Sequence, residues 1–372
     1  MSLSLKKRKF WRLAIGVILL GLISLFVYKT ADESEWFWVP FLTPAPAEIE
    51  LPVVSAKKER GAISLMFGGD VMLSRTVNAK MAAYNNYLWP FQKIASTSAA
   101  ADITVINLES PFLKNADYRV PTGSFSFKAD PKALAGLSLA GVDVVALANN
   151  HMLNAGRKGL SDTMTLLKEA GILTAGAGLN EAEARQAAIV DKDGWKIAFL
   201  SYAYPQDNSV ATIDRPGIAA LDKKNLKTDI DAVRAEVDLV IVLMHAGTEY
   251  VSRPGEQQKT FARTAIEAGA DAVIGHHPHW PQSWEIYQGK PIIYSLGNFV
   301  FDQMWSQETS RGLLARLVFQ PDYSGQAELM PIEIKDYGQA QLWPDDKDEK
   351  IFWESFKLEA PIDLSWPASA GN

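Results

Sequence analysis

Residues 239–279 read LVIVLMHAGTEYVSRPGEQQKTFARTAIEAGADAVIGHHPH, and they contain the pattern on which the predicted fold depends. The run LVIVLM is continuously apolar, GEQQKTFARTAIEAGA has the spacing of an amphipathic helix, and DAVIG is a second short apolar run. Buried strands of α/β proteins have such unbroken apolar runs, with helices between them. The stretch therefore predicts strand, helix and strand, and histidine follows each predicted strand.

The same alternation extends along most of the chain after residue 62. Helical patterns lie between several of the apolar runs, for example DPKALAGLSLAG (130–141) and GLSDTMTLLKEAG (159–171). This alternation predicts the α/β class. The predicted buried strands are ISLMFG (63–68), ITVINL (103–108), DVVALA (143–148), KIAFLSY (196–202), LVIVLM (239–244), DAVIG (271–275) and PIIYSLG (291–297).

The last part of the chain has a different pattern. RGLLARLVFQ (311–320) and QAELMPIEI (326–334) are typical of antiparallel strands around a Tyr-Ser-Gly turn. We expect one domain over residues 61–338, and after it an acidic, tryptophan-containing extension over 339–372. Within that extension, DEKIFWESFKLEA (348–360) predicts a short helix.

The N-terminal part differs from the rest in composition. A basic tail (1–9) precedes an almost wholly apolar segment (10–29), and four prolines then fall within residues 40–52 of a linker (30–60). The apolar segment is long enough to cross a membrane as a helix. The basic residues before it predict a cytoplasmic N-terminus, a single-pass anchor in the cell membrane and an extracytoplasmic C-terminal domain. The proline-rich linker is typical of an extended spacer.

The apolar segment has two alternative interpretations. A cleavable signal peptide is the main rival, but no small-x-small cleavage site precedes KTADESEW, and Trp36 and Trp38 are typical of interfacial anchors. A buried core helix is disfavoured by the four consecutive basic residues, 6–9, that flank the segment.

Composition excludes several classes of function. Hydrophobic residues at 48% and charged residues at 22% are ordinary for a globular protein. The chain has no cysteine, so any metal must be held by nitrogen and oxygen ligands. Beyond residue 29 there are 31 Lys and Arg against 43 Asp and Glu, a formal net charge of −12. No basic stripe with interleaved aromatics is present, so we expect no nucleic-acid partner.

Polar residues gather where the predicted strands end. In an α/β sheet, loops from separate strands converge beyond their carboxyl ends and bind ligands there. Five such ends would bring two carboxylates, two asparagine amides and all five histidines to one rim. The residues concerned are Asp70, Glu109, Asn149, Asn150, His151, His245, His276, His277 and His279.

These residue types suit a metal centre. Imidazole and carboxylate are appropriate ligands for Zn, Mn or Fe. In His277-Pro278-His279, a loop could direct the two rings at neighbouring ions. Two such ions bridged by a carboxylate would form a two-metal hydrolytic site.

Each residue alone has a plainer interpretation. Asp70 after Gly-Gly is most often part of a turn or a helix cap, and Glu109 before Ser-Pro could be a solvated loop acid. His245 could be a partly buried histidine with its hydrogen bonds satisfied. Their joint position at successive strand ends favours the metal centre, because the plainer interpretation needs five coincidences.

The chain resembles the CapA-type poly-γ-glutamate capsule biosynthesis proteins, which are related to calcineurin-like metallophosphoesterases. The resemblance covers roughly residues 63–335. It is carried, in order, by GGDVML, INLESPF, FSFKADP, GVDVVALANNHMLNAG, LMHAGTEY, IGHHPHWPQ and YSLGNFVFDQ. It implies a four-layer α/β/β/α metallophosphoesterase-like sandwich, here preceded by the transmembrane helix.

The resemblance also implies roles for single residues. Asp70 and His279 would serve one divalent ion, Asn150, His245 and His277 a second, and Glu109 would bridge the two. His151 would face the reacting group as general acid or transition-state stabiliser. The residues expected around these ligands or toward substrate are Asn149, Glu249, His276 and Asn298.

Two positions depart from the phosphoesterase pattern. Met72 stands where that pattern has histidine, and a thioether is a poor ligand for a hard metal. Asn154 stands where many relatives have aspartate. Both changes weaken the prediction of catalysis more than that of the fold.

Two functions of different class follow. The first is a membrane-anchored, metal-dependent hydrolase or phosphoesterase-like enzyme that serves the production of a cell-surface polymer. The second is a non-catalytic component that binds or passes on poly-γ-glutamate, or recruits other capsule-synthesis membrane proteins. Action on an unrelated phosphoester or surface glycan is a third possibility. The charge of −12 disfavours simple sequestration of a polyanion.

Overall fold

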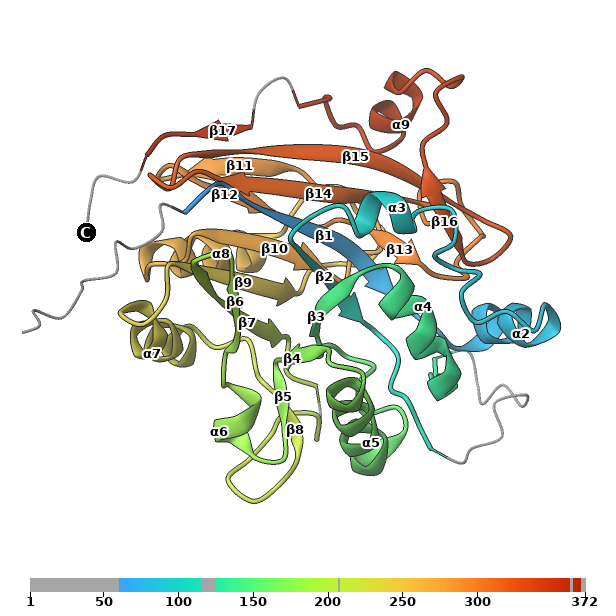
Figure 1. Ribbon diagram of the computed structural model, residues 1–372, viewed down its shortest axis with the longest axis horizontal. Helices are drawn as coiled ribbons and strands as arrows, with labels where there is room; N and C mark the ends of the chain where they lie inside the picture. The colour runs from blue at the N-terminus through green and yellow to red at the C-terminus, as the bar shows by residue number, and fades with distance from the viewer. Residues whose placement is uncertain (1–59, 115–124, 207, 362–363, 369–372) are drawn as a thin grey trace, which may run out of the picture. The chain divides into compact units, whose positions relative to one another are not determined.

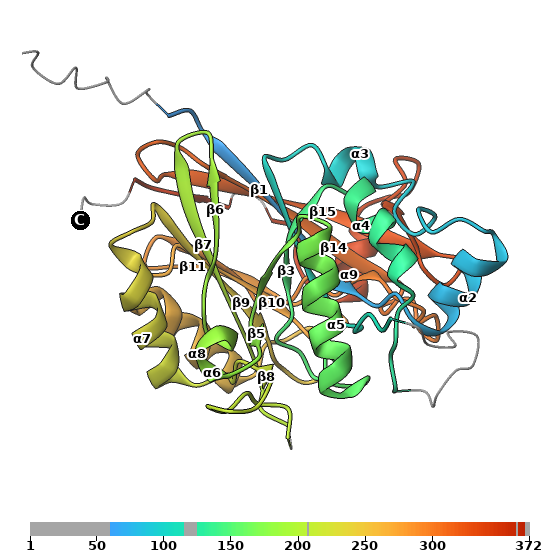
Figure 2. The same ribbon diagram turned by 60° about the horizontal axis from the view of Figure 1, so that its bottom comes forward.

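The computed structural model describes residues 60–114, 125–206, 208–361 and 364–368. Within these residues the chain forms two large β-sheets, with helices on the outer face of each (Figures 1 and 2). The predicted α/β fold is confirmed.

The first sheet runs in the order β16-β15-β14-β1-β2-β3-β4, with β13 beside β1 and β17 beside β15. Strands β1 to β4 are mutually parallel, and β14 pairs with β1 in the antiparallel sense. The bounds are β1 (Ile63–Val71), β2 (Ile103–Leu108), β3 (Val142–Ala146), β4 (Leu173–Ala175), β13 (Asn298–Val300), β14 (Arg311–Phe319), β15 (Gly325–Lys335), β16 (Gln339–Leu342) and β17 (Ser365–Trp366).

The second sheet runs in the order β11-β12-β10-β9-β7-β6. Its four central strands are parallel, and its two edge strands are antiparallel to their neighbours. The bounds are β6 (Ala188–Lys192), β7 (Trp195–Ala203), β9 (Leu239–His245), β10 (Ala272–His276), β11 (Trp284–Tyr287) and β12 (Lys290–Ile293), and β5 (Ala177–Gly178) pairs separately with β8 (Gly217–Ile218).

Three apolar clusters hold the layers together. Phe67 of the first sheet and Ile241 of the second lie in the cluster between the sheets. Leu160 packs on the outer face of the first sheet, and Leu226 and Phe261 pack on that of the second. The layers are therefore helix, sheet, sheet and helix (Figure 2). The helical segments are α2 (Arg75–Ala83), α3 (Ala95–Ser98), η1 (Pro131–Ala133), α4 (Leu134–Leu139), α5 (Gly156–Glu169), α6 (Glu181–Ala184), α7 (Lys223–Arg234), α8 (Glu256–Glu267) and α9 (Lys350–Ser355).

A β-bulge at the Gly-Gly pair 68–69 turns Asp70 toward the space between the sheets. In the pairing of β1 with β2, Phe67 lies opposite Val105 and Asp70 lies opposite Asn107. Between these two pairs, β1 advances by three residues and β2 by only two, so β1 contains one extra residue. Strand side chains alternate between faces, and one extra residue reverses that alternation. Asp70 therefore lies on the face of Phe67, whereas an unbulged strand would point it toward the helices.

The second sheet supplies the facing side of the same rim. β9 ends at His245 and β10 ends at His276, and these two residues are register partners. The strands are parallel, so both carboxyl ends lie at one edge of the sheet. The loops that follow His245 and His276 consequently begin side by side.

The segment after residue 338 packs into the same core. β16 and β17 both pair with β15, and Phe352 and Trp353 of α9 are buried in the cluster between the sheets. The short helix expected within 348–360 is present as α9.

The predicted basic tail (1–9), the predicted membrane-spanning helix (10–29) and all of the predicted linker (30–60) except Arg60 lie outside the described residues. Among the residues that the structure does describe, no helix has both the length and the apolar character needed to cross a membrane.

The bulge can be tested by substitution of Gly69. A Cβ atom there would lie 1.9 Å from the carbonyl oxygen of Gly297, which accepts a hydrogen bond from the amide of Asp70. We expect Gly69→Ala to lower the free energy of unfolding by about 1–3 kcal/mol, as overpacking does elsewhere. Urea denaturation would measure it. Gly61→Ala is the control, because a Cβ there meets nothing within 4 Å. Equal midpoints for the two variants would contradict the close approach.

Candidate metal centre

Asp70 is fully buried and accepts hydrogen bonds on both oxygens. Its Oδ1 accepts from Asn107 Nδ2 at 2.8 Å, and its Oδ2 accepts from the amide of His277 at 3.2 Å. His279 Nδ1 lies 3.2 Å from Oδ2. Burial opposes ionisation, but the hydrogen bond from His279 and the charge of the nearby imidazoles lower the pKa of Asp70 below its ordinary value. Asp70 is therefore an ionised carboxylate inside the protein.

Glu109 lies beside it and is also fully buried. Its Oε2 accepts from Asn107 Nδ2 at 3.3 Å, whereas its Oε1 has no hydrogen-bond partner. Burial and then the charge of Asp70 raise the pKa of Glu109 well above its usual range. A buried acceptor without a donor is costly, and a bound cation would remove that cost.

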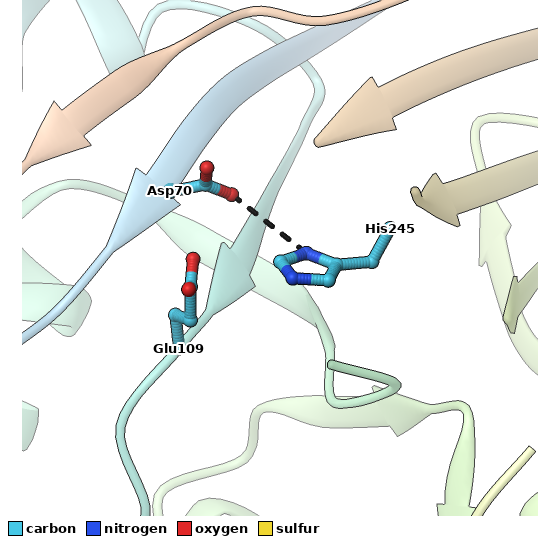
Figure 3. Close-up of side chains that lie close together, drawn as sticks. All are labelled: Asp70, Glu109 and His245. Carbon is cyan, nitrogen blue, oxygen red and sulfur yellow. Dashed lines mark ion pairs between the residues drawn. The ribbon is translucent and has the colours of Figure 1, made fainter. Parts of the chain in front are cut away.

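His245, at the end of β9, faces these two carboxylates (Figure 3). Its Nε2 lies 2.8 Å from Asn150 Oδ1, and its Nδ1 lies 3.2 Å from Asn107 Nδ2. Because Asn150 Oδ1 is an acceptor and Asn107 Nδ2 a donor, the proton is on Nε2 and the lone pair is on Nδ1. Burial lowers the pKa of His245 well below its ordinary value. The imidazole is therefore neutral and presents its lone pair to the carboxylates.

The loop after β10 has unusual backbone geometry. His277 and His279 have φ values of 97° and 58°, in the left-handed region that residues other than glycine seldom adopt. Tyr250, at φ 61°, donates its amide hydrogen to the carbonyl of Pro278 and fastens the loop to the segment after β9. Such strain is common at functional sites.

The two histidines of that loop approach the carboxylates differently. His279 Nδ1 lies 2.9 Å from Asn298 Oδ1 as well as near Asp70, so Nδ1 carries the proton and Nε2 has the lone pair. That Nε2 lies 3.9 Å from Glu109 Oε1. His277 Nδ1 is buried without a partner, and burial lowers the pKa of His277 to about 4.

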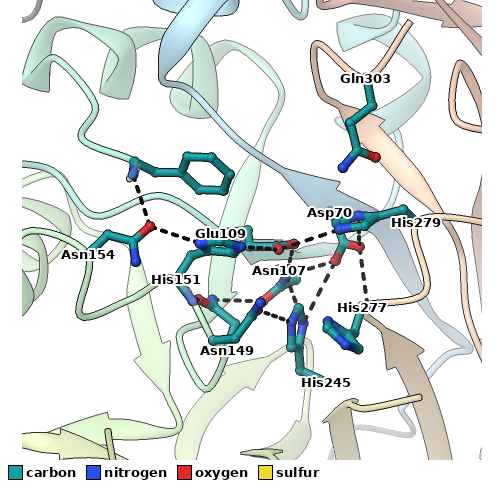
Figure 4. A network of polar contacts seen from close by, with 12 residues as sticks. Asp70, Asn107, Glu109, Asn149, His151, Asn154, His245, His277, His279 and Gln303 are labelled. Carbon is teal, nitrogen blue, oxygen red and sulfur yellow. Dashed lines mark hydrogen bonds and ion pairs between the residues drawn. The ribbon is translucent and has the colours of Figure 1, made fainter. Parts of the chain in front are cut away.

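His151 closes the other side of the cluster (Figure 4). Its ring lies 4.1 Å from that of Phe127, and its Nδ1 lies 2.8 Å from Asn154 Oδ1. The same Oδ1 accepts from the amide of Phe127, so His151 carries its proton on Nδ1. Its Nε2 faces Glu109 Oε1 at 3.8 Å. Burial lowers the pKa of His151 to about 4 despite the hydrogen bond to Asn154.

Asn107 occupies the centre of the network and was not predicted (Figure 4). It is fully buried and contacts Asp70, Glu109 and His245 through one nitrogen atom. The sequence contains a signal for it, because a lone polar residue interrupts the apolar run ITVINL two positions before Glu109. Residues two apart share one face of a strand, so Asn107 and Glu109 project together.

Three residues lie outside the group of ligand atoms formed by Asp70, Glu109 and His245. Two of them, His276 and Glu249, are expected around the ligands or toward substrate, and the third is Met72. His276 is buried but its Nε2 lies 3.2 Å from the carbonyl oxygen of Gly68. Glu249 is exposed. Met72 is buried in the apolar cluster of the outer layer, and its sulfur accepts from the amide of Ser74. Position 72 therefore contributes an apolar side chain to the core and no imidazole ligand to the cluster.

Asn149 and Asn298 form hydrogen bonds that hold neighbouring residues of the cluster in position. Asn149 Nδ2 donates to the carbonyl of Leu108 at 2.8 Å, and its Oδ1 accepts from the amide of His151. Asn298 donates to Gln303 Oε1 and to the carbonyl of Thr309. Both amides are satisfied by the protein and orient their neighbours.

The donor set fits a divalent cation. Ligand atoms of Asp70, Glu109 and His245 all lie within 4.8 Å of one another. The lone pairs of His245 Nδ1, His279 Nε2 and His151 Nε2 face the same carboxylates, and Glu109 Oε1 has no protein donor. Neutral imidazoles and carboxylates are the form in which these groups bind metal.

The fold and this cluster together define an α/β protein with a candidate metal centre. The sequence profile of the bacterial capsule synthesis protein PGA_cap family matches residues 64–303, and the chain belongs to that family. The capsule biosynthesis protein CapA of Bacillus anthracis is 30% identical over 286 residues, which cover 75% of this chain and 69% of that protein.

A second curated protein and a solved structure are also similar to this chain. The PGA biosynthesis protein CapA of Bacillus subtilis is 29% identical over 312 residues, 83% of this chain and 81% of that one. Among solved structures, the NAD nucleotidase of Haemophilus influenzae covers 82% of this chain and 64% of its own, at 13% identity and a TM-score of 0.41. That score does not establish a common fold.

Removal of the charge on Glu109 should stabilise the protein when no metal is present. The raised pKa means that folding disfavours the charged form, so stability falls as pH rises above the ordinary glutamate value of about 4.3. At pH 8 in EDTA, we expect Glu109→Gln to be more stable than wild type by about 1.4 kcal/mol for each unit by which folding raises the pKa of Glu109. At pH 4, the two proteins should differ little in stability. Urea denaturation at both values would measure this, with exposed Glu328→Gln as control. A wild type as stable as Glu109→Gln at pH 8 would contradict the buried repulsion.

Asn154 is the uncharged hydrogen-bond partner of His151 Nδ1, and its lack of charge affects the pKa of the His151 ring. In Asn154→Asp, a carboxylate would receive the Nδ1 proton of His151 and favour the imidazolium. We expect the pKa of His151 to rise from about 4 by about 1–3 units, measured by NMR titration of the imidazole carbon-bound protons. Asn225→Asp, at the start of α7, is the control. An unchanged His151 titration in Asn154→Asp would contradict the assigned contact.

Proposed function

We propose that this chain is a metal-dependent hydrolase that serves poly-γ-glutamate capsule biosynthesis from the outer side of the cell membrane. Membership of the capsule synthesis family and the names of its relatives support the process. The cluster of carboxylates and imidazoles supports the chemistry.

One observation carries the proposal. Glu109 Oε1 is buried beside the ionised Asp70, has no donor, and is approached by the lone-pair nitrogens of His151 and His279. A protein gains nothing in stability from such a set of acceptors alone. A cation bound among them would make the arrangement favourable.

The residues expected for two ions form one group with His279 and one with His245. Asp70 contacts both, because its Oδ2 lies 3.2 Å from His279 Nδ1 and its Oδ1 lies 4.0 Å from His245 Nδ1. His245 in turn contacts Asn150 and lies beside the ring of His277, so the residues expected for two ions lie next to one another. Divalent ions such as Mn, Zn or Fe, when bound, lower the pKa of a coordinated water and polarise the bond to be cleaved.

The protein's own groups have distinct tasks. His151 is neutral and turns its Nε2 lone pair to the centre, so it acts as proton acceptor first and as donor only after it has been protonated. The role expected from the resemblance is general acid or transition-state stabiliser, and the proposal adds that His151 must first take up a proton before it can act as an acid. Asn154 fixes the tautomer, and Phe127 stacks on the ring and limits access of water to it.

The membrane location rests on sequence alone. The apolar segment 10–29, with basic residues on its N-terminal side, supports a single-pass anchor, and the linker 30–60 would hold the domain away from the bilayer. Other membrane proteins of capsule synthesis and the polymer itself are the partners that this arrangement suits.

One observation favours a second candidate function. Met72 packs into the apolar cluster, so one imidazole of the phosphoesterase pattern is absent. A site that binds metal but turns over slowly would suit a polymer-binding or assembly component. Metal ions would then offset the net charge of −12 that the residues after 29 carry, and would permit contact with a polyanion.

Metal content is the direct test of the site. We expect the purified protein, after incubation with Mn²⁺ and gel filtration, to hold one or two ions per chain, as two-metal sites do. In His277→Ala/His279→Ala the content should fall below about one tenth of that, because each lost ligand costs at least tenfold in affinity. His276→Gln is the control, because that ring faces Gly68. Equal metal content in wild type and the double variant would contradict the site.

Catalysis is tested separately with His151→Gln. We expect this variant to keep its metal and to lose hydrolysis of bis(p-nitrophenyl) phosphate by at least about 100-fold, the usual contribution of a proton-transfer residue. A metal-loaded wild type without hydrolysis of this ester or of a γ-glutamyl oligomer would favour the assembly role instead.

A further inference from the structure

Three acceptor atoms converge on one nitrogen at the centre of the cluster. Asn107 Nδ2 lies 2.8 Å from Asp70 Oδ1, 3.2 Å from His245 Nδ1 and 3.3 Å from Glu109 Oε2. These three residues are the same ones whose ligand atoms lie within 4.8 Å of one another. Asn107 therefore holds together the group that would bind a cation.

The amide nitrogen cannot satisfy all three acceptors. A primary amide has two N–H bonds, so one of the three lone pairs is without a hydrogen at any moment. All four residues are buried. A divalent cation would interact with all three acceptors at once, whereas the amide is an incomplete substitute for it.

Asn107 also lies beside Asp70 in a chain whose position 72 offers no imidazole. Met72 provides no imidazole and packs in the outer layer. Asn107 is the register partner of Asp70 on the neighbouring strand β2, so its side chain enters the cluster beside that carboxylate. An amide oxygen is a suitable ligand for a hard divalent ion.

We propose that Asn107 is a ligand of the metal centre, through Oδ1, and that its amide reverses between a cation-free and a cation-bound state. Without a cation, Nδ2 donates to the carboxylates and reduces their repulsion. With a cation, Oδ1 faces it and replaces the imidazole that position 72 lacks. The inference rests on the proposed metal centre and adds a residue that the phosphoesterase pattern does not contain.

The reversal needs no extra volume, but it costs one hydrogen bond. The oxygen and the nitrogen of an amide are nearly equal in size, so rotation by half a turn needs no new space. Asn107 Oδ1 accepts at present from Asn149 Nδ2 at 3.2 Å. Asn149 Nδ2 keeps its bond to the carbonyl of Leu108 at 2.8 Å when Asn107 turns, but it then faces Asn107 Nδ2, so one hydrogen bond is replaced by a contact between two donors. The bound cation must offset that loss.

Two variants of the full-length protein distinguish whether Asn107 is a metal ligand or only a hydrogen-bond donor to the ligands. Asn107→Ala removes both the oxygen and the nitrogen, whereas Asn107→Asp keeps an oxygen and removes the N–H groups. Mn²⁺ is the probe, with affinity from calorimetry and the number of exchanging inner-sphere waters from water-proton relaxation. Circular dichroism would verify that each variant is folded, and Gln257→Ala, an exposed amide on α8, is the control.

We expect Asn107→Ala to bind Mn²⁺ about 10–100-fold more weakly and to show higher relaxivity, because a water takes the vacated position. Asn107→Asp should bind at least as tightly as wild type and show wild-type relaxivity. Weaker binding in both variants with unchanged relaxivity would make Asn107 a donor only and would overturn the proposal. So would wild-type affinity in Asn107→Ala. Absence of Mn²⁺ binding by the wild type would instead overturn the proposed metal centre, and this inference with it.

Discussion

The repulsion between two buried carboxylates is the constraint on which the centre of this protein depends. Asp70 and Glu109 are both fully buried, and burial, followed by the charge of Asp70, raises the pKa of Glu109 well above its usual range. Most of the surrounding polar groups reduce that cost. Asn107 donates to both, and His279 and the amide of His277 donate to Asp70. Of the four oxygens of these two carboxylates, Glu109 Oε1 is the one without a donor, and this unsatisfied atom is the strongest sign of a bound cation.

The backbone is shaped around the same point. The bulge at 68–69 turns Asp70 inward, and the close approach of Gly69 to Gly297 leaves no room for a side chain. On the opposite sheet, His277 and His279 adopt positive φ values, and Tyr250 ties their loop down. Strain of this kind costs stability and persists where the surrounding structure enforces it. Each sheet thus gives up regular geometry at its carboxyl end, and the two irregular ends face one another.

The sequence predicts the layers and most of the cluster, because apolar runs reveal buried strands and polar residues mark their ends. It does not reveal which face a strand-end residue takes. Asp70 reaches the cluster only through the bulge, which depends on pairing with β2, and pairing is not visible in one strand. His276 and His277 are adjacent and equal in type, yet the ring of His276 faces the carbonyl of Gly68 and the ring of His277 lies beside that of His245. Asn107 was overlooked because it lies inside an apolar run.

Membership of the capsule synthesis family gives the process, and the cluster gives the chemistry that this chain can offer to it. The most direct test of the metal centre is a crystal structure of the protein soaked in Mn²⁺, with data collected for anomalous scattering from manganese. We predict an anomalous peak within coordination distance of Asp70, Glu109 and His245. If the soaked crystals show no anomalous density at that position, whether or not manganese is found elsewhere, the result would contradict a metal centre between the two sheets.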